Sequence, residues 1–525
     1  MLGADAKSRL LHWLLILGIL VPALACTLPT MQFTDSMESF NVLTAVEIVR
    51  DGHWAVPTLW GRPRLEKPPL AHWLTALGIL TGGRLEFSAR FITVMLSCLT
   101  LVVAYEWGRL LCGARTALIA VAIAGTNIAF LRFSRRAGYD SHLMFWVTLT
   151  NYALTWFVMR GRMRPAVLVG GLALGGALMS KGPPALLHTL VPVGAFAVWV
   201  SLQTRQVALL RKTALVLLLV LTIGVAVTIP WVVAVVRQSD LQVARLWLGQ
   251  VMLEPEAIEG LYTPPLQGFV FLGMLAPWTL WYLMAFAECW RTRKSAGRQL
   301  GFLLTLSLLP VVIHAFIPPM RDRYLLPMMV PAAIACAIVV AGWLERSRAG
   351  QLTLGDKIAY IVHLTLTFGL VAGYPLFFGF TAEDHMHLGV ALALASVGAA
   401  ALAVAVALRR RFPAALIVAT VVCMLQYQMV YAWHQNREPR AVETAGRQVA
   451  ADGGIARMAA YVDNTPPRAF ALYADKPLVL VSNASAVPAG SVLVTEKPGP
   501  EGWVWVLEFR EGRHLWTIWQ RPAAK

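Results

Sequence analysis

Long apolar runs alternate with short polar segments over most of the chain. A helix needs about 20 predominantly apolar residues to cross a bilayer. Runs of this kind occupy 10–29, 87–110, 114–132, 140–159, 165–180, 184–202, 213–236, 266–288, 299–317, 324–343, 357–378, 386–408 and 413–432. The stretch 165–202 is divided because Lys181-Gly182-Pro183-Pro184 interrupts it, and proline breaks helices. The pattern predicts an all-α polytopic membrane bundle of about 13 transmembrane helices.

The first 25 residues also have features of a signal peptide. Lys7 and Arg9 precede the apolar run, and Ala23-Leu24-Ala25 matches a cleavage site. We favour an uncleaved first helix, because this run opens a long series of similar runs.

The charges of the connecting segments alternate in sign. With the N-terminus inside, every inner loop is net basic, as the positive-inside rule expects. These loops hold Arg109, Arg115, Arg160, Arg162, Arg164, Arg205, Arg211, Lys212, Arg291, Arg293, Lys294, Arg298, Arg346, Arg348, Lys357, Arg409, Arg410 and Arg411. The outer segments hold most of the acids, although Arg132, Arg135 and Arg136 are basic there. An odd number of spans then predicts a cytoplasmic N-terminus and a C-terminus on the opposite side.

The chain changes character after residue 432. Short runs at 477–482, 491–496, 503–509 and 514–520 are typical of strands and are separated by Pro/Gly turns. Residues 441–450 have the pattern of a helix. We therefore predict a transmembrane domain over 1–432 and a small α/β domain over 433–525 on the outer side.

The first outer segment, 30–86, is long for a loop, and loops of such length are usually functional. Phe40, Leu43, Val46 and Val49 recur every three residues, which predicts a helix on the membrane surface. The pattern of residues 71–80 predicts a second helix, which is too short to span the membrane.

Composition agrees with a membrane protein. Hydrophobic residues make up 58% and charged residues 14% of the 525 residues, whereas soluble proteins are about 45–50% apolar and about 25% charged. The net charge of +17 does not indicate nucleic-acid binding, because the excess lies in short loops and the tail 433–525 is nearly balanced. The six cysteines lie in or beside apolar runs without a CxxC pair, so they predict neither a disulfide framework nor a metal site.

The densest charged cluster is Gly61-Arg62-Pro63-Arg64-Leu65-Glu66-Lys67-Pro68-Pro69-Leu70 in the first outer segment. Its cations suit a phosphate, and its carboxylate suits a metal ion or the orientation of a cation. The alternative is a basic turn that binds lipid headgroups ahead of a helix starting at the proline pair.

Carboxylates mark two other places on the outer side. Asp140 opens the fourth expected span, where an ionisable side chain is a candidate functional group; a helix N-cap is the alternative. Asp35 and Glu38 lie one helical turn apart and either present two carboxylates to one site or act as acidic residues at a helix start.

Cations mark two further outer helix ends. Lys181 lies at a hairpin, as a site residue or as a lysine that snorkels to the surface. Arg323 and Tyr324 lie at the start of the tenth span, where arginine suits phosphate but Arg and Tyr also suit interfacial anchoring. The convergence of these clusters on one side of the membrane is a stronger signal than any one of them.

Histidines and nucleotide motifs add little to this picture. The sequence contains no P-loop, and His53, His72, His142, His188 and His314 show no metal-ligand spacing, so we interpret them as structural.

At the charged clusters the sequence resembles a known family. MESFNVLTAVEIVRDGHWAVPTLWGRPRLEKPPLAHWLTAL (37–77) resembles the first periplasmic loop of the bacterial aminoarabinose transferases of lipid A and their dolichyl-phosphate-mannose–protein mannosyltransferase-like relatives, which are C-type membrane glycosyltransferases. RAGYDSHL (136–143), LALGGALMSKGPPAL (172–186) and RDRYLLPMMVPAA (321–333) are similar to motifs of that family in the same order. The resemblance covers 30–345 and extends to the later part only in architecture.

The resemblance implies roles for individual residues. Lys67 corresponds to a lysine that contacts the donor phosphate, and Arg323 with Tyr324 to residues near the same phosphate; Lys181 joins these candidates. Glu66 is a candidate ligand of a divalent metal ion, the one cofactor that we expect.

The catalytic candidates are carboxylates. Asp140 opens the fourth span as the family's aspartate does. Many relatives have Asp-Glu where this chain has Met37-Glu38, so either Asp35 or Glu38 does the work of that pair.

The expected function is transfer of a sugar from a polyprenyl-phosphate-linked donor to a periplasmic acceptor at the bacterial inner membrane. Lipid A or another envelope glycan or lipid is the favoured acceptor, and a protein hydroxyl, as in O-mannosylation, is the alternative. A transporter or flippase of lipid-linked sugars is the alternative from a different class, but such proteins hold their charges near mid-membrane. The expected partners are the donor, the acceptor and membrane lipids, without nucleic acid.

Overall fold

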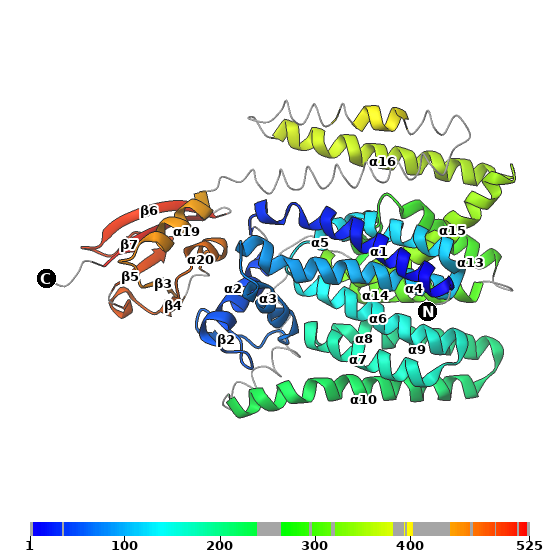
Figure 1. Cartoon of the computed structure of the whole chain (residues 1–525), viewed down its shortest axis with the longest axis horizontal. Coiled ribbons are helices and arrows are strands. Elements are labelled where there is room, and N and C mark those ends of the chain that lie inside the picture. Colours follow the sequence, from blue (N-terminus) through cyan, green and yellow to red (C-terminus); the bar gives the residue numbers. More distant parts are fainter. Residues whose placement is uncertain are drawn as a thin grey trace. The chain divides into compact units, whose positions relative to one another are not determined.

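The computed structural model in Figure 1 describes residues 4–33, 36–238, 264–292, 297–316, 321–381, 393, 396–402, 441–462, 466–488, 490–511 and 514–521. Contacts divide the chain into two units. The first unit comprises Met1–Ala25, Thr93–Val232 and Gly249–Tyr431, and the second comprises Cys26–Ile92, Val233–Leu248 and Ala432–Lys525. The first outer segment is thus grouped with the C-terminal region, which the sequence analysis treated as a domain by itself.

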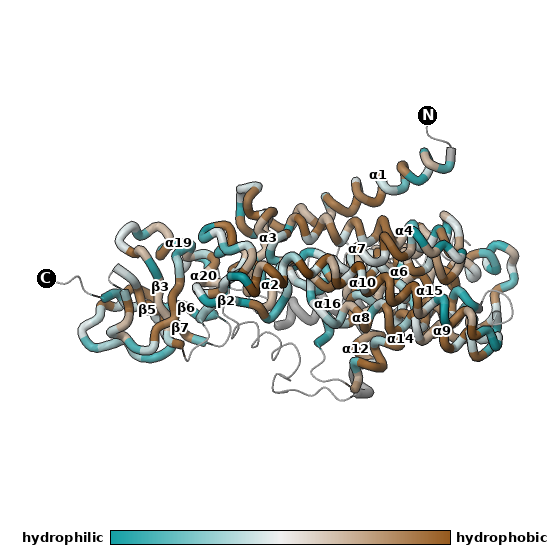
Figure 2. The backbone as a smooth tube through the Cα atoms, turned by 90° about the horizontal axis from the view of Figure 1, so that it is seen from below, coloured by the Kyte–Doolittle hydropathy of each residue, from teal (hydrophilic) through white to brown (hydrophobic). Residues whose placement is uncertain are grey.

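The first unit is helical. Its elements are α1 (Ala4–Ala25), most of α4 (Leu85–Thr126), α5 (Ile128–Phe133), α6 (Tyr139–Arg160), α7 (Met163–Lys181), α8 (Pro184–His188), α9 (Leu190–Thr204), most of α10 (Val207–Gln238), α12 (Pro264–Met274), α13 (Thr279–Arg291), α14 (Gly297–Ala315), η2 (Asp322–Met328), α15 (Met329–Arg348) and α16 (Leu354–Thr381). The helices are mostly hydrophobic along their length (Figure 2).

The protein is a multi-pass membrane protein. Seven described helices are long and apolar enough to cross a membrane, or up to 8 if the bent pair Gly268–Met274 and Thr279–Arg291 forms one span. Helix α4 covers two expected runs, joined at Gly113, whose φ of 83° breaks the helical geometry. The expected spans 386–408 and 413–432 lie largely outside the described residues, so the count of thirteen stays a prediction.

Glycines let α7 approach its two neighbours closely. A Cβ at Gly171 or Gly175 would lie 2.6 or 2.5 Å from side-chain atoms of α10, and a Cβ at Gly176 would lie 2.5 Å from Trp146 of α6. Small residues are how helices in a membrane reach close packing, because lipid supplies no hydrophobic drive between them. This packing fixes the direction of α7, which ends at Lys181.

Gly176→Ala is expected to destabilise the bundle. The added methyl group overlaps the indole of Trp146, and overpacking of this kind costs about 1–3 kcal/mol. A thermal unfolding series in detergent measures the effect. Gly18→Ala in α1 is the matched control, because nothing lies within 4 Å of its added Cβ. An unchanged midpoint for Gly176→Ala would contradict the close packing of α6 on α7.

In the second unit, the first outer segment folds into η1 (Leu28–Thr30), α2 (Ser36–Asp51), the hairpin β1 (Thr58–Leu59) and β2 (Arg62–Pro63), and α3 (Leu70–Leu80). The two expected helices are present as α2 and α3, and their position on the membrane surface stays a prediction. They pack through Ala45, Ile48 and Ala76.

The hairpin turn has positive φ at both central residues, 56° at Trp60 and 73° at Gly61. Positive φ is costly for a bulky side chain such as tryptophan. Glu47 of α2 compensates by accepting hydrogen bonds from the Trp60 N–H (2.6 Å), the Gly61 N–H (3.3 Å) and the Thr58 hydroxyl (2.7 Å). Helix α2 therefore holds the turn that leads into the Lys67 segment.

The C-terminal part of this unit is a small α/β domain, as expected. Its elements are α19 (Ala441–Ala451), β3 (Arg457–Tyr461), α20 (Arg468–Ala474), β4 (Leu478–Val481), η4 (Ala484–Ala486), β5 (Ser491–Thr495), β6 (Val504–Glu511) and β7 (His514–Gln520). The sheet order is β4-β3-β5-β7-β6, with β3 parallel to both β4 and β5 and the other pairs antiparallel.

The sequence analysis identified four of these strands and α19 but missed β3 and α20. Strand β3 reads Arg-Met-Ala-Ala-Tyr and lacks the β-branched residues that mark strands. Helix α20 has 7 residues, and its start depends on Glu511, whose carboxylate accepts from the N–H groups of Arg468, Ala469 and Phe470 at 2.8–3.1 Å. Burial raises the pKa of the Glu511 carboxyl, and these donors oppose that shift.

Candidate functional site

Four of the predicted site residues meet at helix ends in the first unit. Asp140 is the second residue of α6, Lys181 is the last residue of α7, and Arg323 and Tyr324 lie in η2. The Lys181 ammonium donates to Oδ1 of Asp140, and Arg323 Nε lies 3.4 Å from Oδ2. The ammonium also lies 3.8 Å from the centroid of the Tyr324 ring. We call these four residues the buried ion cluster.

Local breaks in the backbone put these side chains at helix ends. Extended Gly138 precedes α6, and Gly182, with φ 78°, ends α7 directly after Lys181. Arg321 is extended and starts η2. The sequence places a glycine at two of these breaks, where a non-helical conformation costs least.

Two alternative interpretations from the sequence are wrong. Asp140 is not an N-cap, because Gly138 occupies that position and no side chain caps the helix. Lys181 does not snorkel to the surface, because only 7% of its side chain is exposed and its ammonium is paired with Asp140. Both side chains are committed to an internal contact.

Among the described side chains, the four residues of the buried ion cluster hold two cations and one carboxylate. Asp140 faces two cations, and the neighbouring Asp322 is engaged elsewhere, 2.7 Å from Arg132. Side-chain exposure is 8% for Asp140 and 15% for Arg323. Buried charge is costly unless it is compensated, so an excess cation at this place suits an anionic ligand such as a phosphate ester.

Two histidines that the sequence analysis took as structural lie beside this cluster. The His314 ring is 6.0 Å from the Tyr324 ring, and the His188 ring is 5.3 Å from the His314 ring. Their positions near the ends of α14 and α8 were visible in the sequence. Without metal-ligand spacing, however, no local signal connected them to the charged residues.

The remaining predicted residues belong to the second unit, except that Asp35 lies outside the described residues. Lys67 is half-buried, and it makes no ion pair or hydrogen bond within the described part of the chain. Glu66 is 56% exposed, and its carboxylate lies 3.6 Å from Arg64 Nη2. The lysine of the Glu-Lys-Pro-Pro motif is thus available to a ligand.

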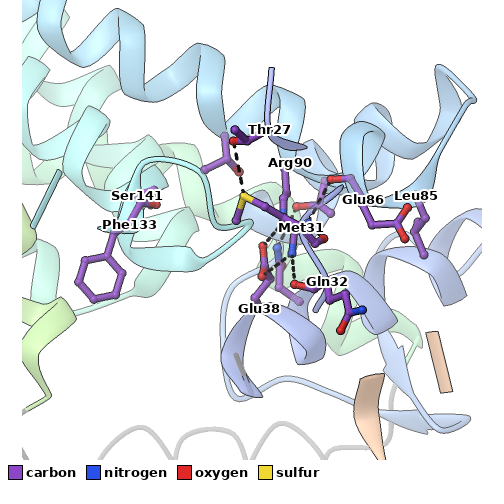
Figure 3. Close-up of polar contacts among 12 residues, drawn as sticks. Thr27, Met31, Gln32, Glu38, Leu85, Glu86, Arg90, Phe133 and Ser141 are labelled. Atoms are coloured by element: carbon purple, nitrogen blue, oxygen red, sulfur yellow. Dashed lines mark hydrogen bonds and ion pairs between the residues drawn. The ribbon is translucent and has the colours of Figure 1, made fainter. Parts of the chain in front are cut away.

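Glu38 is engaged by an arginine that the sequence analysis did not single out. Arg90 of α4 is fully buried and forms a bidentate pair with Glu38 at 2.7 and 2.9 Å. Its other donors reach the carbonyl oxygens of Met31, Gln32 and Glu86 (Figure 3). Arg90 thereby ties the start of α2 to the segment before it and to α4, which gives Glu38 a positioning role.

The described residues do not assemble a metal site around Glu66. No group of three His, Cys, Asp or Glu side chains in the described ranges is placed to hold a metal ion. The nearest charged partner of Glu66 is the cation Arg64. A metal at Glu66 does not fit this donor set, and we assign it no step of the chemistry.

The fold defines the class of protein. It matches two crystal structures of ArnT from Cupriavidus metallidurans, one bound to undecaprenyl phosphate and one in the apo state, each with a TM-score of 0.77 at 16% identity. These matches cover 96% and 98% of this chain and 97% and 98% of the ArnT chains. The chain therefore has the fold of the C-type membrane glycosyltransferases, as the sequence predicted.

Sequence comparison identifies a family and individual proteins to which this chain is similar. The family described as dolichyl-phosphate-mannose-protein mannosyltransferase matches residues 66–233. An undecaprenyl phosphate-alpha-4-amino-4-deoxy-L-arabinose arabinosyl transferase of Pseudomonas fluorescens is 26% identical over 371 residues, which are 68% of this chain and 64% of that protein. The corresponding enzyme of Edwardsiella ictaluri is 27% identical over 356 residues, 63% of this chain and 61% of its own length.

These alignments span less than two thirds of the relatives' length. The resemblance to the aminoarabinose transferase and mannosyltransferase-like family, inferred from the motifs, is confirmed. Lys67, Asp140 and Lys181 all lie inside the segment that the family matches.

Proposed function

We propose that this protein is a membrane glycosyltransferase that moves a sugar from a polyprenyl-phosphate-linked donor to an acceptor at the periplasmic face of the bacterial inner membrane. The observation that carries the proposal is the buried ion cluster, in which the cations Lys181 and Arg323 both face Asp140 at helix ends of the first unit. Its place in a fold shared with a protein crystallised with undecaprenyl phosphate supports the same ligand chemistry.

The proposed reaction breaks the bond between the anomeric carbon and the phosphate oxygen and forms a bond from that carbon to the acceptor oxygen. The electron pair of the broken bond stays on the polyprenyl phosphate. Lys181 and Arg323 bind this leaving group and stabilise the charge that it gains, which is the role that fixed cations perform in group transfer. Lys67 is proposed as a donor-phosphate contact through its Glu-Lys-Pro-Pro motif. The ring of Tyr324 holds the Lys181 ammonium in place.

Asp140 is the proposed catalytic carboxylate. In the ligand-free arrangement both of its oxygens face cations. A bound phosphate competes for Lys181 and Arg323 and releases one carboxylate oxygen. That oxygen accepts the proton of a hydroxyl acceptor, whereas a phosphate acceptor needs only positioning and charge neutralisation.

We propose lipid A or another envelope glycan or lipid as the acceptor, with a protein hydroxyl as the alternative, and a pentose or a hexose as the sugar. The names of the relatives support an aminoarabinose-type pentosyl donor. Mass spectrometry of lipid A and envelope glycans from a deletion strain tests this. We expect loss of one sugar mass, restored by the wild-type gene. An unchanged glycan profile would contradict the proposal, and loss of the sugar with the lipid-linked sugar retained on the cytoplasmic side would instead support the transporter.

The proposed topology has Met1 in the cytoplasm and Lys525 in the periplasm. The alternating charges of the loops support it, because basic loops are retained inside. A C-terminal alkaline phosphatase fusion is expected to be active and a C-terminal green fluorescent protein fusion dark. Fusions at Arg205, in a basic loop, provide the opposite control. Fluorescence from the C-terminal fusion would overturn the assignment.

Chelation tests the divalent metal ion that the sequence analysis expected. Because the described residues form no ligand set at Glu66, we expect EDTA to change transfer less than about twofold, well below the several kcal/mol that a catalytic metal supplies. Glu66→Gln is then expected to match the wild type with and without Mg²⁺. Loss of activity in EDTA that Mg²⁺ or Mn²⁺ restores would show a metal role.

A further inference from the structure

The C-terminal domain touches the first outer segment through an aromatic ring. Within the second unit, the Arg468 guanidinium of α20 lies 4.0 Å from the centroid of the Phe40 ring of α2. The Arg64 guanidinium lies 4.6 Å from the same centroid. Trp60 of the hairpin turn meets this ring edge-on at 5.9 Å. Phe40 therefore connects the tail of the chain to the segment that carries Lys67.

The C-terminal sheet fixes where Arg468 stands. Arg468 is the first residue of α20, and its N–H donates to the carboxylate of Glu511 at the end of β6. Two residues after Arg468, the ring of Phe470 stacks on the ring of Phe509 in β6, with the two centroids 4.4 Å apart. The backbone at Arg468 is thus held by the sheet, and its side chain extends from there to Phe40.

Arg64 transmits the contact toward Lys67. It is 7% exposed, and its N–H donates to the carbonyl of Pro57 at 2.7 Å. Only Leu65 and Glu66 separate it from Lys67, and the buried prolines Pro68 and Pro69 follow. Pro68 restricts the backbone of the residue before it, which is Lys67, and because only two residues lie between them, the position of Arg64 bears on that of the lysine.

A second contact holds the same two parts together. Arg447 of α19 lies 3.9 Å from the carboxylate of Glu86 at the start of α4. The ring centroids of Tyr473 in α20 and Phe33 are 6.1 Å apart. The Arg90 guanidinium lies 4.3 Å from the centroid of the same Phe33 ring. These contacts also attach the domain, and the Phe40 contact is the one next to the Lys67 segment.

We propose that Arg468 is a positioning residue for the donor phosphate. Through the Phe40 ring it holds Arg64, and with it the Lys67 segment, so that the C-terminal domain sets the affinity for the polyprenyl phosphate. The inference rests on the proposed function in one respect, namely that Lys67 binds this phosphate.

The test uses the full chain in lipid nanodiscs, with undecaprenyl phosphate as the probe. Arg468→Ala is expected to raise the Kd of undecaprenyl phosphate about 3- to 30-fold, the range that a partly buried cation–π contact covers. Arg468→Lys keeps the charge without the planar stack and is expected to lie between Arg468→Ala and the wild type. Arg457→Ala, an exposed arginine of β3 in the same domain, is the matched control with unchanged affinity.

A second variant tests the route through the ring. Phe40→Leu is expected to raise the Kd as well, and adding Arg468→Ala to it is expected to cost less than twofold more, because residues on one path are not additive. Full additivity would show that Arg468 acts by another route and would overturn the proposal. So would a Kd for Arg468→Ala within twofold of the wild type.

Hydrogen exchange separates this inference from the proposed function. Amides of residues 57–67 are expected to exchange faster in Arg468→Ala, with those of β3 and β5 unchanged. If the wild type does not bind undecaprenyl phosphate, the proposed function fails, while faster exchange in 57–67 still supports the positioning role. Unchanged exchange in 57–67, or equal acceleration throughout the C-terminal sheet, overturns the positioning role whatever the ligand.

Discussion

Asp140→Asn is expected to lower sugar transfer by about 10²–10⁴-fold if the acceptor is a hydroxyl, because a general base contributes that much. The substitution removes the carboxylate that faces Lys181 and Arg323 and leaves an amide of the same size. We expect the affinity for undecaprenyl phosphate to be kept or increased, since the phosphate no longer competes with a carboxylate. Turnover at saturating donor and a separate Kd measure the two effects.

The separation of turnover from affinity distinguishes catalysis from folding. If Asp140 only neutralised its cations, its loss would leave buried charges uncompensated, at a cost of about 3–5 kcal/mol, and would reduce expression and donor affinity together. Glu38→Gln is the comparison at matched expression; it is expected to act mainly through its pair with Arg90. Asp35→Asn completes the series. Near-normal transfer by Asp140→Asn, with transfer abolished by either other variant, would reverse our ranking.

Lys67→Ala is expected to weaken use of the donor by at least about 10-fold while the protein still inserts into the membrane. A charge-assisted contact to phosphate contributes about 1.5–3 kcal/mol, and Lys67 has no competing partner among the described residues. The measurement is the initial rate at limiting donor. At saturating donor we expect much of the rate to return, because the loss is one of binding.

Arg62→Ala is the matched control for Lys67→Ala. Arg62 is exposed in the same segment and carries the same charge, so it reports any general effect of charge on the anionic donor. Equal losses in Arg62→Ala and Lys67→Ala would assign the effect to the electrostatic field of the loop. Unchanged turnover of Lys67→Ala at limiting donor would remove the lysine from the donor site.

The arrangement of ion pairs in the first unit favours an enzyme over a transporter. Asp140 with Lys181 and Arg323 lies where α6 begins and α7 ends. Arg9 forms a bidentate pair with Glu106, near the end of the first part of α4. The second pair attaches α1 to α4. The Asp140 group alone lies at helix ends on the predicted outer side, and this placement suits the proposed reaction at that face better than a path through the bilayer.

Much of the architecture follows from the sequence alone. Apolar runs of spanning length predicted the helices of the bundle, and alternating strands after residue 432 predicted the C-terminal sheet. These features are local, because the hydrophobic period and the turn residues act within a few positions. The same holds for the charged motifs: Asp140, Lys181, Arg323 and Tyr324 stand out because ionisable side chains at membrane helix ends are costly and therefore few.

Only the tertiary structure decided which of these residues share a site. Asp140 and Lys181 are 41 positions apart, and they meet because the glycines of α7 let it pack against the Trp146 side chain of α6. Arg90 looked like one of many basic residues until the fold surrounded it with Glu38 and backbone carbonyls. Pairings of this kind depend on the volumes of side chains on helices distant in sequence, and the pattern of apolar and polar positions does not encode those volumes.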